Sequence, residues 1–170
     1  MNEYFGNYNQ INTYQFITFR TKDSIDSFVQ KLNIEDTNES IKQHKIDDYL
    51  DQSDNGCYLN NEIIDLIIQY SLQLDPEYYQ LFCLSVIPNH VHILFQQKQE
   101  LNKIMQKLKG GLAFSINKRL NNSGTLWQRG YFDKAMRDEK HFQTTYNYIK
   151  NNAIKANLAD ATERFYGVYE

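Results

Sequence analysis

The 170-residue sequence contains only two cysteines, two prolines and no long hydrophobic run. Cys57 and Cys83 lack Cys-x-x-Cys spacing and are too few for a disulfide scaffold. No apolar stretch approaches the roughly 20 residues of a membrane-spanning helix, and residues 1–10 are polar rather than signal-like. We therefore expect a cytoplasmic protein with reduced thiols and no membrane partner.

The chain is slightly acidic overall, with 18 Lys and Arg against 21 Asp and Glu. Residues 101–155, however, contain eleven basic and three acidic side chains, which leaves seven basic and eighteen acidic residues elsewhere. The acidic residues concentrate between Asp23 and Asp54. Such an asymmetry favours a polyanion-binding face that the overall charge conceals, although Lys-rich helices can also be merely solvated.

Two histidines lie one residue apart at the start of an apolar run, residues 90–95. Because strand side chains alternate between faces, His90 and His92 point one way while Val91, Ile93 and Phe95 point the other. A strand of this kind can pack against a core and hold a divalent metal at the same time. Taken alone, paired histidines on a strand are more often surface residues than metal ligands.

Hydrophobic periodicity predicts the remaining elements. Strands are expected at residues 14–20, 79–86, 90–95 and 126–136, with a hairpin turn at Pro88-Asn89. Helices are expected at residues 62–74, 100–120 and 138–152. The apolar stripe of the second helix comprises Leu101, Ile104, Met105, Leu108, Leu112 and Ile116, and Gly110-Gly111 interrupts it at a cost of roughly 1 kcal/mol per glycine.

This order predicts an α+β fold, a ferredoxin-like βαββαβ sandwich with an antiparallel sheet, the histidines on a central strand and an extra C-terminal helix. We expect one face of the sheet to be covered by helices and the other, bearing His90 and His92, to be open. The length fits a single domain, residues 1–170. Within it, the acidic segment at about 23–57 is expected to be an insertion or a lid.

The C-terminal helix offers a third ligand and a nucleophile. Tyr148 and Asn152 are four residues apart and therefore share a face. The amide oxygen of Asn152 can complete a His-His-Asn metal site beside the phenol of Tyr148. Tyr146 is the rival nucleophile, but it lies roughly 200° away around the helix, so only one of the two tyrosines can face the site.

Three motifs, in order, resemble one known family. They are Pro88-Asn89-His90-Val91-His92, the segment Leu126 to Asp138 containing Trp127-Gln128-Arg129-Gly130-Tyr131-Phe132-Asp133, and Tyr148-Ile149-Lys150-Asn151-Asn152-Ala153-Ile154-Lys155-Ala156. The chain resembles the REP-associated tyrosine transposases, single-tyrosine HUH enzymes (His, bulky hydrophobe, His) of the IS200-like group. Asp47-Asp48-Tyr49-Leu50-Asp51 and Leu108-Lys109-Gly110 also resemble family segments. Ala153 and Asn157 stand where the family usually has Pro and Gly.

The resemblance implies a metal-dependent single-stranded DNA endonuclease and strand transferase. His90, His92 and Asn152 would bind Mg²⁺ or Mn²⁺, and Tyr148 would attack the phosphate to form a 5′-phosphotyrosine. The substrates would be hairpin-forming single strands at repetitive sequences, bound by a monomer or a homodimer. Expected phosphate contacts are Lys103, Lys107, Lys109, Arg129 and Arg137, and expected base-stacking residues are Trp127 and Tyr131. Trp127 fits a core position equally well.

Two other functions remain open at this point. A domesticated copy would bind DNA sequence-specifically without turnover, and the departures at Ala153 and Asn157 suit that alternative. A structural Zn²⁺ site in a protein that does not bind DNA is the third. The complete set of His90, His92, Tyr148 and Asn152 favours the enzyme, since a protein that only binds DNA has no need of a nucleophile beside a metal.

Overall fold

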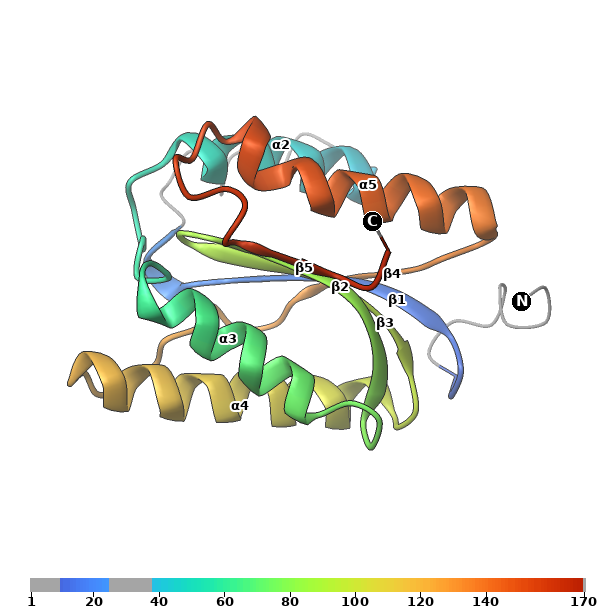
Figure 1. Cartoon of the computed structure of the whole chain (residues 1–170), viewed down its shortest axis with the longest axis horizontal. Helices are drawn as coiled ribbons and strands as arrows, with labels where there is room; N and C mark the ends of the chain where they lie inside the picture. The colour runs from blue at the N-terminus through green and yellow to red at the C-terminus, as the bar shows by residue number, and fades with distance from the viewer. Residues whose placement is uncertain (1–9, 25–37, 170) are drawn as a thin grey trace.

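A five-stranded antiparallel sheet lies between two pairs of helices in the computed structural model, which describes residues 10–24 and 38–169 (Figure 1). The strands are β1 (Tyr14–Arg20), β2 (Tyr79–Ile87), β3 (His90–Gln97), β4 (Phe132–Ala135) and β5 (Phe165–Gly167). The helices are α2 (Glu39–Gln52), α3 (Glu62–Gln73), α4 (Leu101–Leu120) and α5 (Glu139–Lys155), with a 3-10 turn η1 at Lys22–Ser24.

The strand order is β4-β1-β3-β2-β5, and it confirms the predicted ferredoxin-like arrangement. β1 and β3 pair antiparallel at the centre, and β2 pairs with β3 through the expected hairpin. β5 was not predicted; it adds three residues to the outer side of β2. Among the described residues, no helix is long and apolar enough to cross a membrane.

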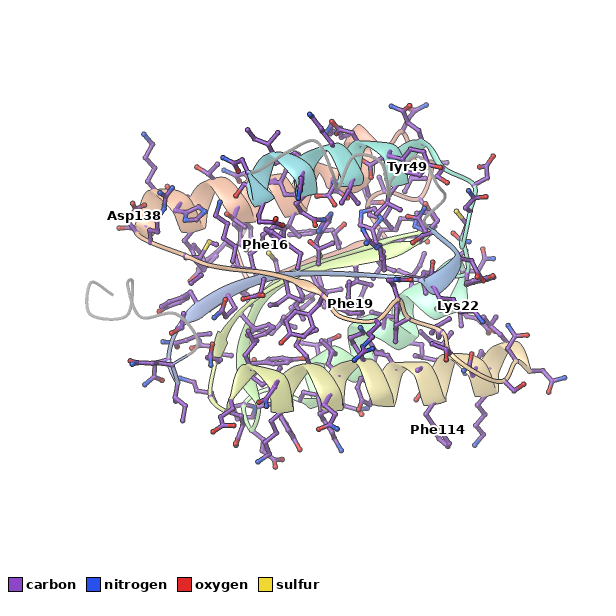
Figure 2. The ribbon with its side chains drawn as sticks, turned by 180° about the vertical axis from the view of Figure 1, so that it is seen from behind. Phe16, Phe19, Lys22, Tyr49, Phe114 and Asp138 are labelled. Atoms are coloured by element: carbon purple, nitrogen blue, oxygen red, sulfur yellow. The ribbon has the colours of Figure 1, made fainter. Side chains whose placement is uncertain are left out.

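Helices cover both faces of the sheet, so the expectation of an open face is wrong. α3 and α4 lie on one face, and α2 and α5 lie on the other (Figure 1). The alternation of β1 shows this directly: Phe16 packs towards α5 and Phe19 packs towards α4 (Figure 2). Each face therefore has its own hydrophobic cluster, and the histidine face is enclosed.

Besides α5, the histidine face of the sheet is covered by α2, which belongs to the acidic segment. Residues 39–52 form α2, whose first turn is capped by the Asn38 side chain, which accepts hydrogen bonds from the backbone N–H groups of Ser40 and Ile41. Ile46 and Leu50 are buried on its inner side. That the segment as a whole is an insertion stays a prediction, because residues 25–37 lie outside the described part of the chain.

The predicted strand at 126–136 is much shorter than expected. Only Phe132–Ala135 forms a regular ladder with β1, and Trp127 forms an isolated bridge with Thr21 beyond the end of β1. The residues before β4 also contact α4, because Trp127 Nε1 donates to the backbone oxygen of Lys109 at 3.0 Å. The Lys109 ammonium in turn donates to the backbone oxygens of Gln128 at 2.9 Å and Gly130 at 2.6 Å.

The two glycines of α4 have different surroundings. A Cβ on Gly111 would lie 1.7 Å from the hydroxyl oxygen of Tyr70, so this glycine permits the close approach of α3 to α4. The Tyr70 hydroxyl donates to the backbone oxygen of Lys107 at 3.1 Å. A Cβ on Gly110 would meet no described heavy atom within 4 Å. The six residues of the predicted apolar stripe are all buried.

Candidate metal centre and tyrosine site

His90 and His92 lie side by side at the start of β3 on the face covered by α2 and α5, and both are completely buried. His92 is paired with Thr18 of β1 and with Ser85 of β2, while His90 is paired with Arg20 and Ile87. The ring centroids are 4.8 Å apart. Val91, Ile93 and Phe95 belong to the cluster on the opposite face, as the alternation predicted.

Each imidazole is oriented through its Nδ1 atom. His90 Nδ1–H donates to Oδ1 of Asn89 at 2.8 Å, and the Asn89 amide is itself held because Nδ2 donates to the backbone oxygen of Leu50 at 3.0 Å. His92 Nδ1 lies 2.7 Å from the hydroxyl oxygen of Thr18. A hydrogen bond at Nδ1 directs the lone pair of Nε2 towards a metal, the usual arrangement of metal-binding histidines.

Burial keeps both imidazoles neutral. It lowers the pKa of His90 and that of His92 to about 3, and the proximity of His92 contributes to the shift of His90. A neutral imidazole is the form that binds a metal, and the ring proton of His90 lies on Nδ1, which leaves its Nε2 atom available.

Two carboxylates from α2 face the histidines. Asp47 Oδ2 lies 3.9 Å from His92 Nε2, and Asp51 Oδ1 lies 3.8 Å from His90 Nε2. Asp47, His90 and His92 each offer a ligand atom, and these three atoms lie within 4.8 Å of one another. Atoms bound to one ion at about 2.1 Å can be at most about 4.2 Å apart, so small side-chain shifts bring the group within reach of a single cation.

Burial raises the pKa of both carboxylates. Burial raises the pKa of Asp47, a shift opposed by the nearby His90 and by hydrogen bonds from Tyr148 and Gln43. Burial, together with the charge of Asp47, raises the pKa of Asp51 to about 7. Two buried carboxylates on one face of the same helix favour a bound cation.

α5 brings Tyr148 to the same site and carries Asn152 on the same face of the helix. The Tyr148 hydroxyl donates to Asp47 Oδ2 at 2.6 Å, and the Tyr148 ring packs edge-on against His92 with centroids 5.5 Å apart. Asn152 follows one turn later and is 1% exposed. Burial, followed by the charge and the hydrogen bond of Asp47, raises the pKa of the Tyr148 phenol.

Tyr146 is turned away from this site. Its hydroxyl donates to the backbone oxygen of Tyr169 at 2.8 Å and accepts from the N–H of the same residue at 2.9 Å. Its ring packs against Phe165, the first residue of β5. Only Tyr148 therefore shares a site with the histidines.

Several buried polar side chains of this part of the fold, the two histidines among them, have atoms without a hydrogen-bond partner. Within residues 10–24 and 38–169, buried side-chain atoms without a hydrogen-bond partner include Nε2 of His90 and of His92, both carboxylate oxygens of Asp51, both amide atoms of Asn152, and Oγ of Ser85. Buried polar groups are nearly always satisfied, and these are nitrogen and oxygen donors of the kind that Mg²⁺, Mn²⁺ and Zn²⁺ accept. The residues present fit a divalent cation.

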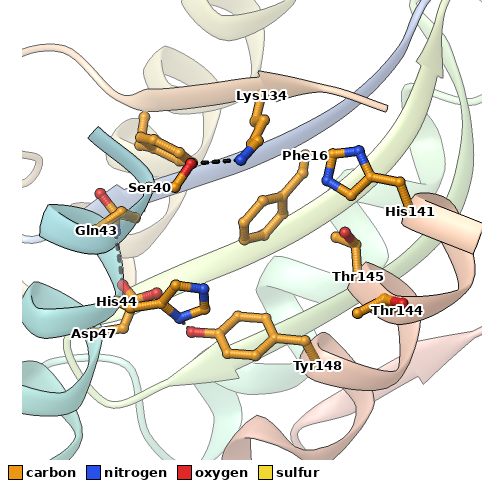
Figure 3. A pocket seen from close by; sticks show the side chains of 11 residues that line it. Phe16, Ser40, Gln43, His44, Asp47, Lys134, His141, Thr144, Thr145 and Tyr148 are labelled. Carbon is orange, nitrogen blue, oxygen red and sulfur yellow. Dashed lines mark hydrogen bonds between the residues drawn. The ribbon is translucent and has the colours of Figure 1, made fainter. Parts of the chain in front are cut away.

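A cavity of about 180 Å³ opens beside the Tyr148 hydroxyl, between α2, α5 and the sheet (Figure 3). The rings of Phe16 and Phe132 form an apolar wall, and Tyr148 meets Phe16 edge-on at 6.1 Å. Polar side chains complete the lining: Ser40, Gln43, His44, Asp47, Lys134, His141, Thr144 and Thr145. The ring of His44 lies edge-on to that of Tyr148, with centroids 5.4 Å apart.

Two further cavities continue from this one around β4. The second shares Gln43 and Phe132 with the cavity beside Tyr148. The third is a groove between α4 and residues 124–131, and it shares residues 128–131 with the second. The three hollows therefore follow one another from the α4 side of the sheet to Tyr148.

The residues expected to contact DNA lie outside the histidine site. Lys103 and Lys107 are exposed on α4, across the sheet from the histidines. Arg129 and Arg137 are exposed in the connections before and after β4, and Tyr131 is half-buried in the groove. Trp127 is 5% exposed and packs edge-on against Phe19 at 4.8 Å, which favours its core alternative.

The sequence analysis assigned no role to Asp47 or Asp51. Their stretch resembled a family segment, but no chemistry was assigned to it. The available signal was the spacing of four residues, which puts both carboxylates on one face of any helix formed there. Which face of α2 would turn towards the sheet depends on contacts distant in sequence, such as that of Leu50 with Asn89.

A family model and a curated protein are similar to parts of this chain. The model of the family described as transposase IS200 like matches residues 58–152. A Haemophilus influenzae protein named only as uncharacterized is 34% identical over 56 residues, which make up 33% of this chain and 31% of the relative. The match thus spans about a third of that relative's length.

Two solved structures share the fold. A REP-associated tyrosine transposase bound to a REP hairpin superimposes with a TM-score of 0.51 at 13% identity, covering 91% of this chain and 74% of the other. A Deinococcus radiodurans protein described as a transposase gives 0.50 at 15% identity, covering 86% and 96% of the two chains.

Proposed function

This chain belongs to the IS200-like transposase family, and on that premise we propose that it cuts and rejoins single-stranded DNA through Tyr148. The observation that carries the proposal is the hydrogen bond from the Tyr148 hydroxyl to Asp47, a member of the Asp47, His90 and His92 ligand group. A nucleophile and a group of metal ligands thus meet at one buried point. Such a pairing suits phosphoryl transfer.

The chemical step forms one phosphate ester bond and breaks another. The phenol oxygen of Tyr148 attacks the scissile phosphorus, the bond from phosphorus to the 3′ oxygen breaks, and a 5′-phosphotyrosine and a 3′-hydroxyl result. Asp47 Oδ2 already accepts the phenol hydrogen at 2.6 Å, so it is positioned to receive that proton. The leaving 3′ oxygen takes a proton from water. Attack of another 3′-hydroxyl on the phosphotyrosine reverses the step and rejoins the strands.

His90, His92 and Asn152, with a carboxylate from α2, would hold the divalent cation. When bound, Mg²⁺ or Mn²⁺ would polarise the scissile phosphate and stabilise its developing charge. Asn89 and Thr18 orient the imidazoles through Nδ1. α2 and α5 exclude bulk water from the ligands, which strengthens the electrostatic interactions within the site.

Basic side chains outside the metal site supply a path for the DNA. Residues 101–132 include six Lys and Arg and no Asp or Glu. A duplex stem would lie on this α4 side near Lys103 and Lys107. The single strand would then follow the connected cavities past Arg129 and Tyr131 to Tyr148. Arg137 would contact the phosphates near the start of α5, and Lys109 and Trp127 would support the groove from within.

The cavity beside Tyr148 would hold a base next to the scissile phosphate. Its aromatic wall of Phe16 and Phe132 can stack on a base, and its hydroxyls and imidazoles can read a base edge. Hairpin-forming strands at repetitive sequences are the proposed substrates, since the similar structure of a REP-associated transposase holds a REP hairpin. We further propose a single domain over residues 1–170, acting in the cytoplasm as a monomer or a homodimer.

The covalent intermediate provides the test. Incubation of the full chain with Mn²⁺ and a hairpin-tailed single-stranded oligonucleotide should give a denaturant-resistant protein–DNA adduct. Tyr148→Phe should abolish it, whereas Tyr146→Phe, a matched change on the opposite side of α5, should retain it. An adduct formed by Tyr148→Phe would refute the assignment.

The two alternatives give different results in the same experiment. A DNA-binding protein without turnover would retain the hairpin oligonucleotide on a native gel and yield no adduct. A structural Zn²⁺ protein would lose stability on chelation and would not bind the hairpin at all. The hydrogen bond between Tyr148 and Asp47 favours the enzyme over both, because neither alternative needs a phenol directed at a metal ligand.

A further inference from the structure

Asp51 is a buried carboxylate beside the histidines that has no role in the proposed reaction. Its side chain is 6% exposed, and its Oδ1 atom lies 3.8 Å from Nε2 of His90. Within the described part of the chain, neither of its carboxylate oxygens has a hydrogen-bond partner. An ionised carboxylate enclosed in this way and left unpaired would be strongly unfavourable.

Asp47, four residues earlier, is occupied on both sides. Its Oδ1 accepts from Gln43 Nε2 at 2.7 Å, and its Oδ2 accepts from the Tyr148 hydroxyl at 2.6 Å. The two carboxylates thus differ. Asp47 accepts hydrogen bonds from a side chain of its own helix and from the nucleophile, whereas Asp51 accepts none from the described residues. The free carboxylate faces an imidazole whose Nε2 atom is also unpartnered among the described residues.

α2 has few other connections to the histidine strand. Its inner side buries Ile46 and Leu50, and the backbone oxygen of Leu50 accepts a hydrogen bond from Asn89. An exposed contact between Lys155 and Asp48 links it to α5. The Lys134 ammonium also donates to the Ser40 hydroxyl, and the Tyr148 hydroxyl donates to Asp47, so polar contacts contribute much of what holds α2 on the sheet.

We propose that Asp51 is a ligand of the same cation as His90, so that metal binding fastens α2 to β3 and α5. This inference rests on the proposed metal site and adds a residue and a consequence to it. The cation would be held from three separate elements: the carboxylate from α2, imidazoles from β3, and the amide of Asn152 from α5. The metal would therefore order the helix that covers the site as well as assist the reaction.

Opposite effects in the presence and absence of metal distinguish a ligand from an ordinary buried residue. Without metal, Asp51→Asn removes an enclosed charge and should raise the melting temperature of the protein. With saturating Mn²⁺, the increase in melting temperature that wild type gains should largely disappear in the variant. If Asp51 only helped to pack α2 on the sheet, the substitution would shift both measurements in the same direction.

The decisive measurement is the binding of Mn²⁺ alone to the full chain, by calorimetry or by loss of the free Mn²⁺ resonance. Asp51→Asn should weaken binding about 10- to 100-fold. Asp54→Asn makes the same change at an exposed position two residues after the helix and should leave affinity within about twofold. Hydrogen exchange across residues 39–52 should slow when Mn²⁺ is added to wild type, and much less in Asp51→Asn.

The inference would be overturned if Asp51→Asn bound Mn²⁺ with unchanged affinity. It would also be overturned if Mn²⁺ did not slow hydrogen exchange in α2 of the wild type. Tyr148→Phe separates this question from the proposed reaction, because that variant should form no DNA adduct and yet bind Mn²⁺ with nearly wild-type affinity. An adduct that forms normally while Asp51→Asn binds Mn²⁺ like wild type would leave the proposed function intact and refute the role of Asp51.

Discussion

The Tyr148 hydroxyl lies 2.6 Å from Oδ2 of Asp47 and donates its hydrogen to that carboxylate. The same oxygen is 3.9 Å from Nε2 of His92. One carboxylate thus contacts the nucleophile while it borders the ligand group, and this contact gives the first prediction.

Asp47→Asn should slow the formation of the protein–DNA adduct by about 100-fold or more, because the neutral amide accepts a proton far less well than a carboxylate. The measurement is the initial rate at saturating Mn²⁺, so that a weakened metal site does not limit the reaction. Asp48→Asn, the neighbouring exposed carboxylate, is the control. A wild-type rate in Asp47→Asn would show that the proton leaves Tyr148 by another route.

Asn89→Ala should weaken Mn²⁺ binding about 10- to 100-fold without removing a ligand. Its side chain accepts from His90 Nδ1 at 2.8 Å and donates to the backbone oxygen of Leu50 at 3.0 Å, so its loss frees both the imidazole and the end of α2. Asn55→Ala is the matched control, because Asn89 contacts only the backbone oxygen of that residue. Equal affinities in the two variants would contradict a role for Asn89 in orienting His90.

The two adjacent glycines of α4 should respond oppositely to alanine. Gly111→Ala should lower the free energy of unfolding by roughly 1–3 kcal/mol, because its Cβ would displace the Tyr70 ring from the α3–α4 contact and break its hydrogen bond to Lys107. Gly110→Ala should raise it by up to about 1 kcal/mol through better helix propensity. Urea denaturation of both variants checks the contrast, and similar changes in the two would argue against close packing at Gly111.

Gly110→Ala also reports on the DNA path. Gly110 lines the groove between α4 and residues 124–131, so an added methyl group should weaken hairpin binding while it stabilises the fold. Unchanged hairpin affinity would remove the groove from the proposed path.

Arg164 and Asp160 provide a prediction about pH. A hydrogen bond from Arg164 lowers the pKa of the Asp160 carboxyl. A carboxyl whose pKa is lower in the folded state contributes stability above its unfolded pKa of about 3.9, and this contribution is lost as the pH falls through the folded value. The stability advantage of wild type over Asp160→Asn should therefore be present near neutral pH and shrink in acid.

The two proteins differ only at residue 160, so titration of the buried histidines affects them equally and cancels in the difference. Urea denaturation at a series of pH values gives the comparison. A difference that stays constant down to about pH 3 would mean that Arg164 does not depend on an ionised Asp160.

Local periodicity was sufficient for the elements that carry the site. The alternation of β3 placed His90 and His92 together, and the helical spacing of α5 placed Tyr148 and Asn152 on one side and Tyr146 on the other. These relationships depend only on neighbours within a few residues, so they can be read from the chain itself. The roles of these residues in catalysis and metal binding stay proposals.

Long-range contacts explain what the sequence did not reveal. α2 has only two buried apolar side chains, Ile46 and Leu50, and this pattern is too weak to predict that it covers the histidines. Similarly, residues 126–131 have strand-like composition, but Lys109 and Trp127 hold them against α4. In both cases the deciding partner is distant in the sequence.

Both borders of the sheet are short strands: β4 has four residues and β5 has three. Unpaired backbone groups along a border invite strands from other molecules, and very short border strands limit this risk. The central strand β3 lies between β1 and β2, and eight of the nine residues of β2 are buried although β5 pairs only with Cys83–Ser85. A second copy of the chain would therefore meet the first through its helices rather than by extending the sheet.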